Sequence, residues 1–292
     1  MTDEKKEQER KGELLGDLSR REFVTLSLAA GLGAAAPAAS GKELPVIETD
    51  VEVKTPDGTC DAVFIYPAKD SHPGVLIWPD SLGLRPVIRG LGKRIAAEGY
   101  SVLLPNHLYR MARAPVFDES FNYQNPADRE RYGRIVAPFL APGAAERDAV
   151  AYVAFLDAQR QVNKKKKIGT HGYCLGGAYV IKTAAALPDR IGAGASFHGG
   201  FLVTDKPNSP HLLAPKIKAH LYFAIASDDD KREPDVKDKL KEAFAAAEVR
   251  AEIEVYPNAL HGWCVPDSRA GDNKADAERA WSKLVALYKA AL

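Results

Sequence analysis

The stretch Gly172-Tyr173-Cys174-Leu175-Gly176-Gly177 decides the fold, because it sets a cysteine among glycines between an apolar run and a helical pattern. A sharp turn from strand to helix brings backbone segments close together, so only glycine fits beside the residue at its apex. At the head of a helix, free amides and the positive end of the dipole favour a thiolate. A lone cysteine is more commonly a buried, inert side chain. The glycines on both sides favour Cys174 as a nucleophile instead.

Short apolar runs alternate with stretches of helical spacing on both sides of this turn. Most runs are continuous, which is typical of strands that helices cover on both faces. Parallel neighbours need a helical crossover, so the alternation predicts an α/β fold with a doubly wound, mainly parallel sheet. Pro56-Asp57-Gly58 predicts a turn in an N-terminal antiparallel hairpin. The expected strands are 46–53, 60–66, 74–78, 100–104, 167–171, 194–197, 220–226 and 251–256, and the expected helices are 87–98, 144–161, 177–186, 234–247 and 275–290.

A nucleophile at such a turn needs a base and an acid that orients the base. Folds with this turn supply them in the chain order nucleophile, acid, histidine. His261 comes last, just after the final expected strand, and is therefore the candidate base. The acid is expected in the turn after the strand 220–226, which contains three consecutive aspartates. Asp229 is the first choice, Asp230 the second and Asp228 the third, and the two that are not used would be solvated turn carboxylates.

Several stretches in combination resemble the dienelactone hydrolases, from about residue 51 to residue 287. They are the turn around Cys174, with cysteine in place of the commoner serine, His261-Gly262-Trp263, the stretch 78–84, the stretch 97–105 and the stretch 196–200. The resemblance implies an α/β-hydrolase fold with a triad of Cys174, Asp229 and His261. It implies that the triad cleaves an ester or a lactone by acyl transfer, through an enzyme thioester. It also implies an oxyanion hole formed by the backbone amides of Leu175 and Ser81.

The resemblance further implies residues that bind the substrate or tune the thiol. Asp80 stands where the family carries an acid, usually glutamate, that interacts with the resting thiol. Arg110 stands where an arginine helps to hold a substrate carboxylate. A second arginine is expected four residues beyond the histidine, but this chain has Val265 there, which argues against a preference for acidic lactones. The remaining candidates are Trp263 at the pocket, and His198 and His107, which either line the pocket or pack as structural histidines.

The segment 108–142 breaks the alternation of strands and helices and is rich in aromatic residues, arginine and proline. We expect it either to pack over the site as a cap or to form a plain surface excursion. Cys60 and Cys264 have no glycine neighbours and are expected to be structural.

Residues 1–40 follow a different pattern from the rest of the chain. A charged leader ends in Arg20-Arg21, and an apolar, alanine-rich stretch follows at 24–36. This order predicts an export signal of the twin-arginine type, so that the catalytic domain, 41–292, works in the periplasm or outside the cell. The apolar stretch is well short of the roughly 20 residues that a membrane span needs, so no stable membrane anchor is expected.

Composition narrows the class of protein further. The 292 residues are 46% hydrophobic with a net charge of +1, which gives no electrostatic argument for binding nucleic acid. Three cysteines cannot form a disulfide framework, and no motif predicts a metal or another cofactor. The expected partner is a small ester or lactone, with the protein a monomer or a small homo-oligomer. Two alternatives stay open: a non-catalytic ligand-binding protein on the same fold, and a periplasmic redox thiol protein, although no resolving cysteine stands near Cys174.

Overall fold

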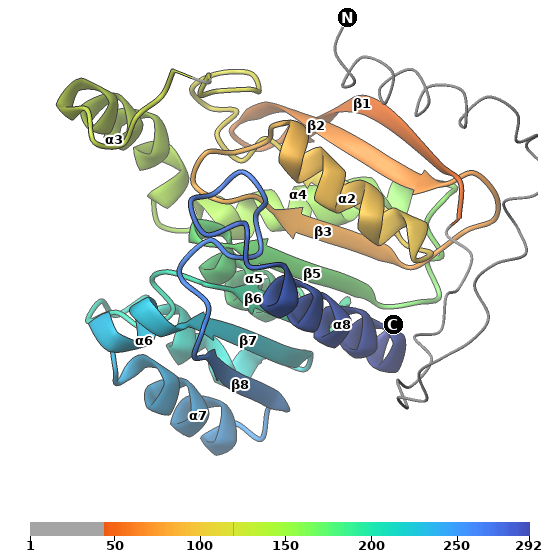
Figure 1. Ribbon diagram of the computed structural model, residues 1–292. Helices are drawn as coiled ribbons and strands as arrows, with labels where there is room; N and C mark the ends of the chain where they lie inside the picture. The colour runs from red at the N-terminus through yellow and green to blue at the C-terminus, as the bar shows by residue number, and fades with distance from the viewer. Residues whose placement is uncertain (1–43, 119) are drawn as a thin grey trace, which may run out of the picture. The chain divides into compact units, whose positions relative to one another are not determined.

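Eight strands form one sheet in the order β1-β2-β4-β3-β5-β6-β7-β8 in the computed structural model, which describes residues 44–118 and 120–292 (Figure 1). Strand β2 pairs antiparallel with both β1 and β4, and every other neighbouring pair is parallel. The predicted α/β fold with an N-terminal antiparallel hairpin is therefore confirmed. The strands are β1 (Val46–Thr55), β2 (Gly58–Pro67), β3 (Gly74–Trp78), β4 (Ser101–Pro105), β5 (Ile168–Tyr173), β6 (Ile191–Phe197), β7 (His220–Ala226) and β8 (Ala251–Tyr256).

Helices cover both faces of this sheet. In Figure 1, α2 and α8 lie in front of the sheet and α4 and α5 lie behind it. Side chains alternate along β3, so Val75 and Ile77 join the core under α2 and α8, whereas Leu76 and Trp78 join the core under α4, α5 and α7. The helices are α2 (Pro86–Ala97), α3 (Pro126–Leu140), α4 (Ala144–Ala158), α5 (Leu175–Ala186), the short 3₁₀ helix η1 (Pro210–Lys216), α6 (Ser227–Arg232), α7 (Val236–Ala246) and α8 (Lys274–Ala291).

Two helices lie where the sequence predicted irregular structure. Helix α3 lies inside the segment 108–142; it starts where the Asn125 side chain accepts a hydrogen bond from the Ala127 amide, and Pro126 follows the cap. An asparagine cap before proline is a helix start signal that the sequence carries. The three aspartates after β7 lie on α6 rather than in a turn. Carboxylates in the first turn of a helix are favoured by its dipole, which explains the difference.

The parallel strands bring the chemistry to one edge of the sheet. Because β5, β7 and β8 run in the same direction, the residues that follow them meet beyond their carboxyl ends, where ligands of such sheets gather. Cys174, Asp229 and His261 follow these three strands in that order. The predicted export signal, 1–40, lies outside the described residues. Among the described residues, no helix has the length and apolar character that crossing a membrane requires.

Candidate active site

Cys174 occupies a strained turn between β5 and α5. Its φ of 51° and ψ of −117° lie outside the regions that ordinary side chains prefer, and such strain persists only where the surroundings enforce it. The Cys174 carbonyl accepts hydrogen bonds from the amides of Gly177 and Gly200, at 2.9 and 3.1 Å, and the Cys174 amide donates to the Phe197 carbonyl at 3.1 Å. These bonds hold the apex of the turn, so the side chain has a defined direction.

The glycines of the turn are explained by close backbone contacts. A Cβ on Gly176 would lie 2.5 Å from the Trp78 carbonyl oxygen, and a Cβ on Gly172 would collide with the Gly176 carbonyl. A Cβ on Gly177 would lie 2.6 Å from the Gly199 Cα. The turn therefore packs directly against the end of β3 and the segment after β6, which the glycine pattern predicted.

The base and the acid are in direct contact. His261 Nδ1 lies 2.7 Å from Asp229 Oδ2, and the Asp229 side chain is 9% exposed. The other two aspartates are engaged elsewhere: Asp228 accepts from the His261 backbone amide at 2.9 Å, and Asp230 pairs with Lys237 at 2.7 Å. The other carboxylate oxygen of Asp229 accepts from Arg232, one turn further along α6. Of the three candidates, Asp229 is thus the carboxylate that orients the imidazole ring.

The charge state of His261 reflects its two partners. Burial lowers the pKa of His261, but the hydrogen bonds with Asp229 and with the Cys174 side chain outweigh it and raise the pKa from 6.5 to about 10. Nδ1 is used by Asp229, which leaves Nε2 for the thiol. At neutral pH the ring therefore holds a proton and places a positive charge beside the sulfur.

Asp229→Asn should lower the pKa of His261 clearly below about 10, because burial would then be opposed by fewer favourable contacts. A titration of the His261 ring protons by NMR measures this directly. A raised pKa in the folded state stabilises the fold fully below about pH 6.5, and this contribution is lost as the pH rises through about 10. The free energy of unfolding should therefore fall less between these two pH values in Asp229→Asn than in the wild type.

Asp228→Asn is the matched control for this prediction, since its carboxylate contacts His261 only at the backbone amide. The pKa of His261 should stay near the wild-type value in that variant. An equal decrease in both variants would contradict a specific role for Asp229.

Two amides at the site have no acceptor among the described residues. Leu175 is the first residue of α5, so its amide has no carbonyl partner within the helix. The Ser81 amide donates to no carbonyl or side chain of the residues that the structure describes. Because Gly176 packs on the carbonyls of Trp78 and Pro79, the segment that carries Ser81 runs beside the start of α5. An oxyanion hole needs two such free amides on neighbouring segments.

Asp80 forms an ion pair rather than a contact with the thiol. Its two oxygens accept from the Arg85 guanidinium at 2.7 and 2.8 Å, and the Leu82 amide donates to it at 3.0 Å. Arg85 also binds Asp267, which lies beyond His261 in the chain. No hydrogen bond joins Asp80 and Cys174 among the described residues. The implied interaction of Asp80 with the resting thiol would require this ion pair to open.

Arg110 is also engaged by carboxylates. Its guanidinium makes two hydrogen bonds of 2.8 Å with Asp148, whose side chain is fully buried, and binds Asp57 at 2.6 Å. The arginine therefore ties α4 to the turn of the β1–β2 hairpin. Its implied contact with a substrate carboxylate disagrees with this geometry, because both edges of the guanidinium already carry an anion.

His198 contacts the turn and the base at once. Its Nδ1 accepts from the Cys174 amide at 3.1 Å, and its ring centre lies 4.8 Å from that of His261. Burial and the nearby His261 charge hold the pKa of His198 well below 6.5, so the ring is neutral. His198 is fully buried, and its Nε2 has no partner among the described residues. The side chain supports the nucleophile rather than lining an open pocket.

Trp263 and His107 pack inside the protein. Trp263 is 1% exposed and packs against the tilted ring of Tyr256 and edge to face against His198, with ring centres 5.1 and 5.2 Å away. His107 follows β4 and lies against Phe139, and burial lowers its pKa to about 3. Neither side chain lies at the groove beside Cys174. His107 therefore packs as a structural histidine, and Trp263 does not occupy the pocket position that the resemblance implied.

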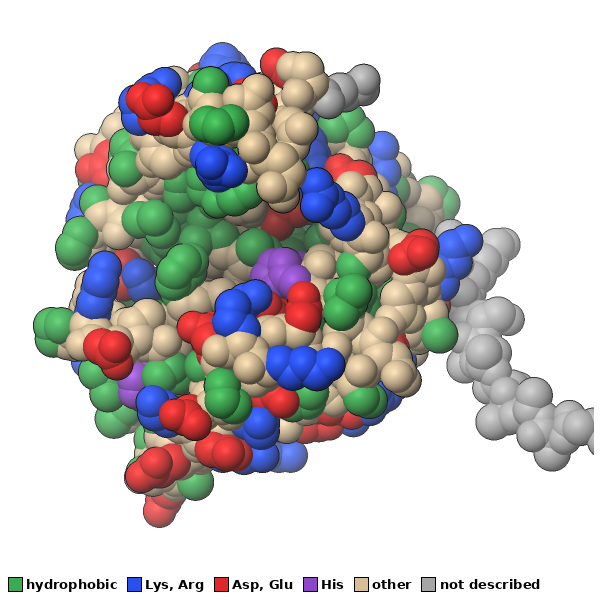
Figure 2. Space-filling view, turned by 60° about the vertical axis from the view of Figure 1, so that its left-hand side comes forward, with side chains coloured by type: hydrophobic (Ala, Val, Ile, Leu, Met, Phe, Trp, Pro, Cys, Tyr) green, Lys and Arg blue, Asp and Glu red, His purple; other side chains and the backbone are tan. Residues whose placement is uncertain are grey.

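A cavity of about 370 Å³ lies at the start of α5, and its lining includes Leu175, the residue that follows Cys174. Its walls are largely apolar and include Leu175 and Tyr179 of α5, Leu140 of α3, and Phe201. Leu140 and Phe201 are 49% and 63% exposed, so both present apolar surface at this cavity. Figure 2 shows a hollow on this side of the molecule that is lined by hydrophobic side chains, with a histidine at its edge.

The segment 108–142 borders this cavity. Leu140 lines it, and Tyr132 of α3 hydrogen bonds with the Ser81 side chain. Of the two expectations for the segment, the cap agrees with these contacts. Sequence reasoning missed the cap residues Tyr132 and Leu140, and also Arg232, whose spacing three residues after Asp229 would have predicted their pairing on a helix.

Cys60 and Cys264 are free thiols away from the turn. Burial raises the pKa of Cys60 to about 12, and its sulfur hydrogen bonds with Tyr152 and with the Asn106 carbonyl. Burial also raises the pKa of Cys264 well above 9.0. Neither sulfur resembles a resolving partner for Cys174, which disfavours the redox alternative.

The fold and the nucleophile turn define an α/β-hydrolase. A family model described as the dienelactone hydrolase family matches residues 60–292. The carboxymethylenebutenolidase of Rhodococcus opacus is 25% identical over 242 residues, which cover 81% of this chain and 88% of that protein. The protein therefore belongs to the dienelactone hydrolase family and is a hydrolase.

Solved structures share the fold. A dienelactone hydrolase from Anabaena variabilis is 17% identical with a TM-score of 0.57, and the match covers 83% of this chain and 98% of that one. A dienelactone hydrolase-like promiscuous phosphotriesterase from metagenomic libraries is 21% identical with a TM-score of 0.68, over 84% of this chain and 98% of that one.

Proposed function

We propose that the protein hydrolyses a carboxylic ester or a lactone by acyl transfer through Cys174. The observation that carries this proposal is the chain of contacts at the site, in which one ring of His261 joins the Asp229 carboxylate, at 2.7 Å, and the Cys174 thiol. A nucleophile, a base and an orienting acid in mutual contact are the requirement for acyl transfer. The relative named carboxymethylenebutenolidase supports the same substrate class.

The reaction proceeds in two halves. His261 holds the proton of the Cys174 thiol while the sulfur attacks the acyl carbon, and the C–O bond of the ester breaks as the C–S bond forms. The leaving oxygen takes the proton from His261. Water then attacks the thioester with His261 as base, the acid is released, and His261 again holds a proton beside the sulfur. The amides of Leu175 and Ser81 would stabilise the oxyanion in both halves, by about 2.7 to 4 kcal/mol per donor.

Hydrolysis of p-nitrophenyl acetate by the purified protein tests the proposal. The wild type should release nitrophenolate and Cys174→Ala should not. Equal rates for the two proteins would overturn the proposed role of Cys174 and would leave the non-catalytic, ligand-binding alternative.

A carboxylate on the substrate should give no large advantage. Arg110 is already paired with Asp148 and Asp57, and Lys182, which lines the cavity, has its ammonium 3.6 Å from Glu146. Lys206 also lines the cavity without an ion pair among the described residues, but a single exposed lysine stabilises an anion only weakly. We expect kcat/KM for a carboxylated lactone to lie within about tenfold of that for the same lactone without the carboxylate, measured side by side. A preference of about a thousandfold for the acidic lactone, about 4 kcal/mol of transition-state discrimination, would contradict this expectation.

We propose further that residues 1–40 direct export by the twin-arginine route, on the basis of Arg20-Arg21 ahead of the apolar stretch 24–36. Changing both arginines to lysine should leave the precursor in the cytoplasm, as measured by immunoblotting of cell fractions. Changing Lys5 and Lys6 to arginine is the matched control and should leave export intact. Normal periplasmic delivery of the Arg20→Lys, Arg21→Lys variant would overturn the proposal.

A further inference from the structure

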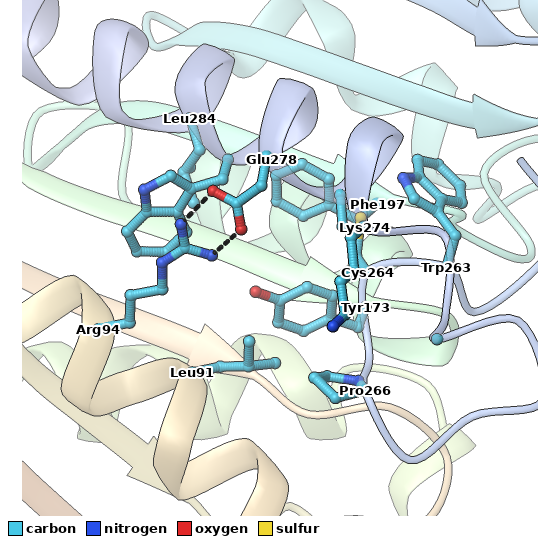
Figure 3. Close-up of a pocket in the computed structure, with 13 residues that line it drawn as sticks. Leu91, Arg94, Tyr173, Phe197, Trp263, Cys264, Pro266, Lys274, Glu278 and Leu284 are labelled. Carbon is cyan, nitrogen blue, oxygen red and sulfur yellow. Dashed lines mark hydrogen bonds and ion pairs between the residues drawn. The ribbon is translucent and has the colours of Figure 1, made fainter. Parts of the chain in front are cut away.

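A second cavity, of about 240 Å³, lies on the other face of the sheet from the substrate cavity. Its lining comes from α2, α8 and the segment after His261, together with the ends of β5 and β6 (Figure 3). Tyr173 and Phe197 belong to the core under α2 and α8, whereas Leu175 and Tyr179 of the substrate cavity belong to the opposite core. The two cavities are therefore separate, although Tyr173 immediately precedes Cys174.

Four of the thirteen residues that line this second cavity are aromatic. The rings of Tyr173 and Phe197 are stacked, with centres 5.5 Å apart, and the other two are Trp263 and Trp281. Aromatic walls favour a planar ligand, because offset-stacked and edge-to-face contacts with rings stabilise a complex beyond simple burial of area. An engineered cavity of about 150 Å³ binds benzene, so about 240 Å³ is enough for one substituted ring.

The Tyr173 hydroxyl provides a polar contact inside this cavity. Tyr173 is 3% exposed, yet its hydroxyl takes part in no hydrogen bond with the described residues. The hydroxyl is not one of the fully enclosed polar atoms that lack a partner, so it is accessible from the cavity and free to hydrogen bond with a ligand. Figure 3 shows the hydroxyl directed toward the side of the cavity where Arg94 and Glu278 lie. Burial raises the pKa of Tyr173, so the group stays a neutral O–H that can donate or accept.

Two of the charged groups at the edge already compensate each other. Arg94 donates to Glu278 at 2.8 Å, and its guanidinium lies 3.9 Å from the ring centre of Trp281 (Figure 3). Lys274 also lines the cavity, and its ammonium has no ion pair among the described residues. Cys264 also lines the cavity, but its raised pKa disfavours a thiolate, and so disfavours covalent capture.

We propose that this cavity is a second binding site, for a ligand built on one aromatic ring with a hydrogen-bonding oxygen. The ring packs among Tyr173, Phe197 and Trp281, and the oxygen pairs with the Tyr173 hydroxyl. Phenol has these features and serves as the probe. A ligand of this size reaches a Kd of about 1 mM when its few atoms bind efficiently.

Titration of the full chain with phenol, followed by tryptophan fluorescence and by saturation-transfer NMR, tests the proposal. Two of the three tryptophans line the cavity, so the fluorescence should change saturably. Toluene, which has the same ring without the hydroxyl, should bind at least threefold more weakly than phenol, and Tyr173→Phe should remove that difference. Alkylation of Cys174 blocks the substrate site but not the second cavity. Phenol binding at the second cavity should therefore persist after alkylation.

Two variants fill the cavity from opposite helices. Ala277→Leu does so from α8 and Leu91→Trp from α2, and each should weaken phenol binding at least tenfold. Ala286→Leu places the same side chain on an exposed position of α8 and should bind phenol as the wild type does. The folding of each variant is checked by circular dichroism. Absence of saturable binding to the wild type, unchanged binding in both filled variants, or loss of binding after Cys174 alkylation would overturn the proposal.

Discussion

Cys174→Ala should lower kcat/KM for a short p-nitrophenyl ester by about 10⁴-fold or more, because no other group at the site can form the acyl intermediate. Activity near the level of the uncatalysed reaction should remain, supported only by binding and by the free amides of Leu175 and Ser81. Cys174→Ser should keep the fold and also lose most activity, since a hydroxyl is a much weaker acid than a thiol at a site arranged for sulfur. Stopped assays with and without enzyme measure all three rates.

Cys60→Ala is the matched control for this substitution. It removes another buried thiol, which hydrogen bonds with Tyr152 far from the nucleophile turn, so it should lower stability and leave kcat within about twofold. A loss of activity in the folded Cys60→Ala protein as large as in Cys174→Ala would contradict the assignment of the nucleophile.

His261→Ala should reduce kcat nearly as much as the loss of Cys174, because the thiol is activated only through this ring. A nucleophile and its base act as one unit, so their losses do not add. The double variant Cys174→Ala, His261→Ala should therefore be no slower, within a few fold, than either single variant. Multiplicative losses in the double variant would show that the two residues act independently and would contradict the proposed chemistry.

Much of the fold could be predicted because its signals are local. The runs 74–78 and 220–226 match β3 and β7 residue for residue, since buried parallel strands are continuous apolar runs. The edge strand β8 also matches its run, 251–256, in which glutamates alternate with apolar residues. The turn at Cys174 could also be predicted, because contacts between backbone atoms restrict its neighbours to glycine. Helix α3 could not be recognised from periodicity, since Gly133 and Pro138 interrupt its pattern and only Val136 and Phe139 are buried on it.

The site depended on contacts that are distant in the sequence. The chain order predicted which strand ends carry the base and the acid, and the structure brings His261 and Asp229 within 2.7 Å. The partners of the arginines could not be predicted in this way. Arg110 meets Asp148, 38 residues further along, only because α4 packs beside the β1–β2 hairpin. Resemblance to a family predicts the position of an arginine, but it does not predict which carboxylates pair with that arginine.

Alkylation followed by mass mapping tests the central claim, that Cys174 is the nucleophile, most directly. The protein is treated with limiting iodoacetamide, and the labelled fraction of each cysteine is compared with the remaining activity. Cys60 is buried, Cys264 is half-buried, and both thiols have raised pKa values, so they should react more slowly. The loss of activity should equal the labelled fraction of Cys174 at every time point. Full activity with Cys174 labelled would contradict the account.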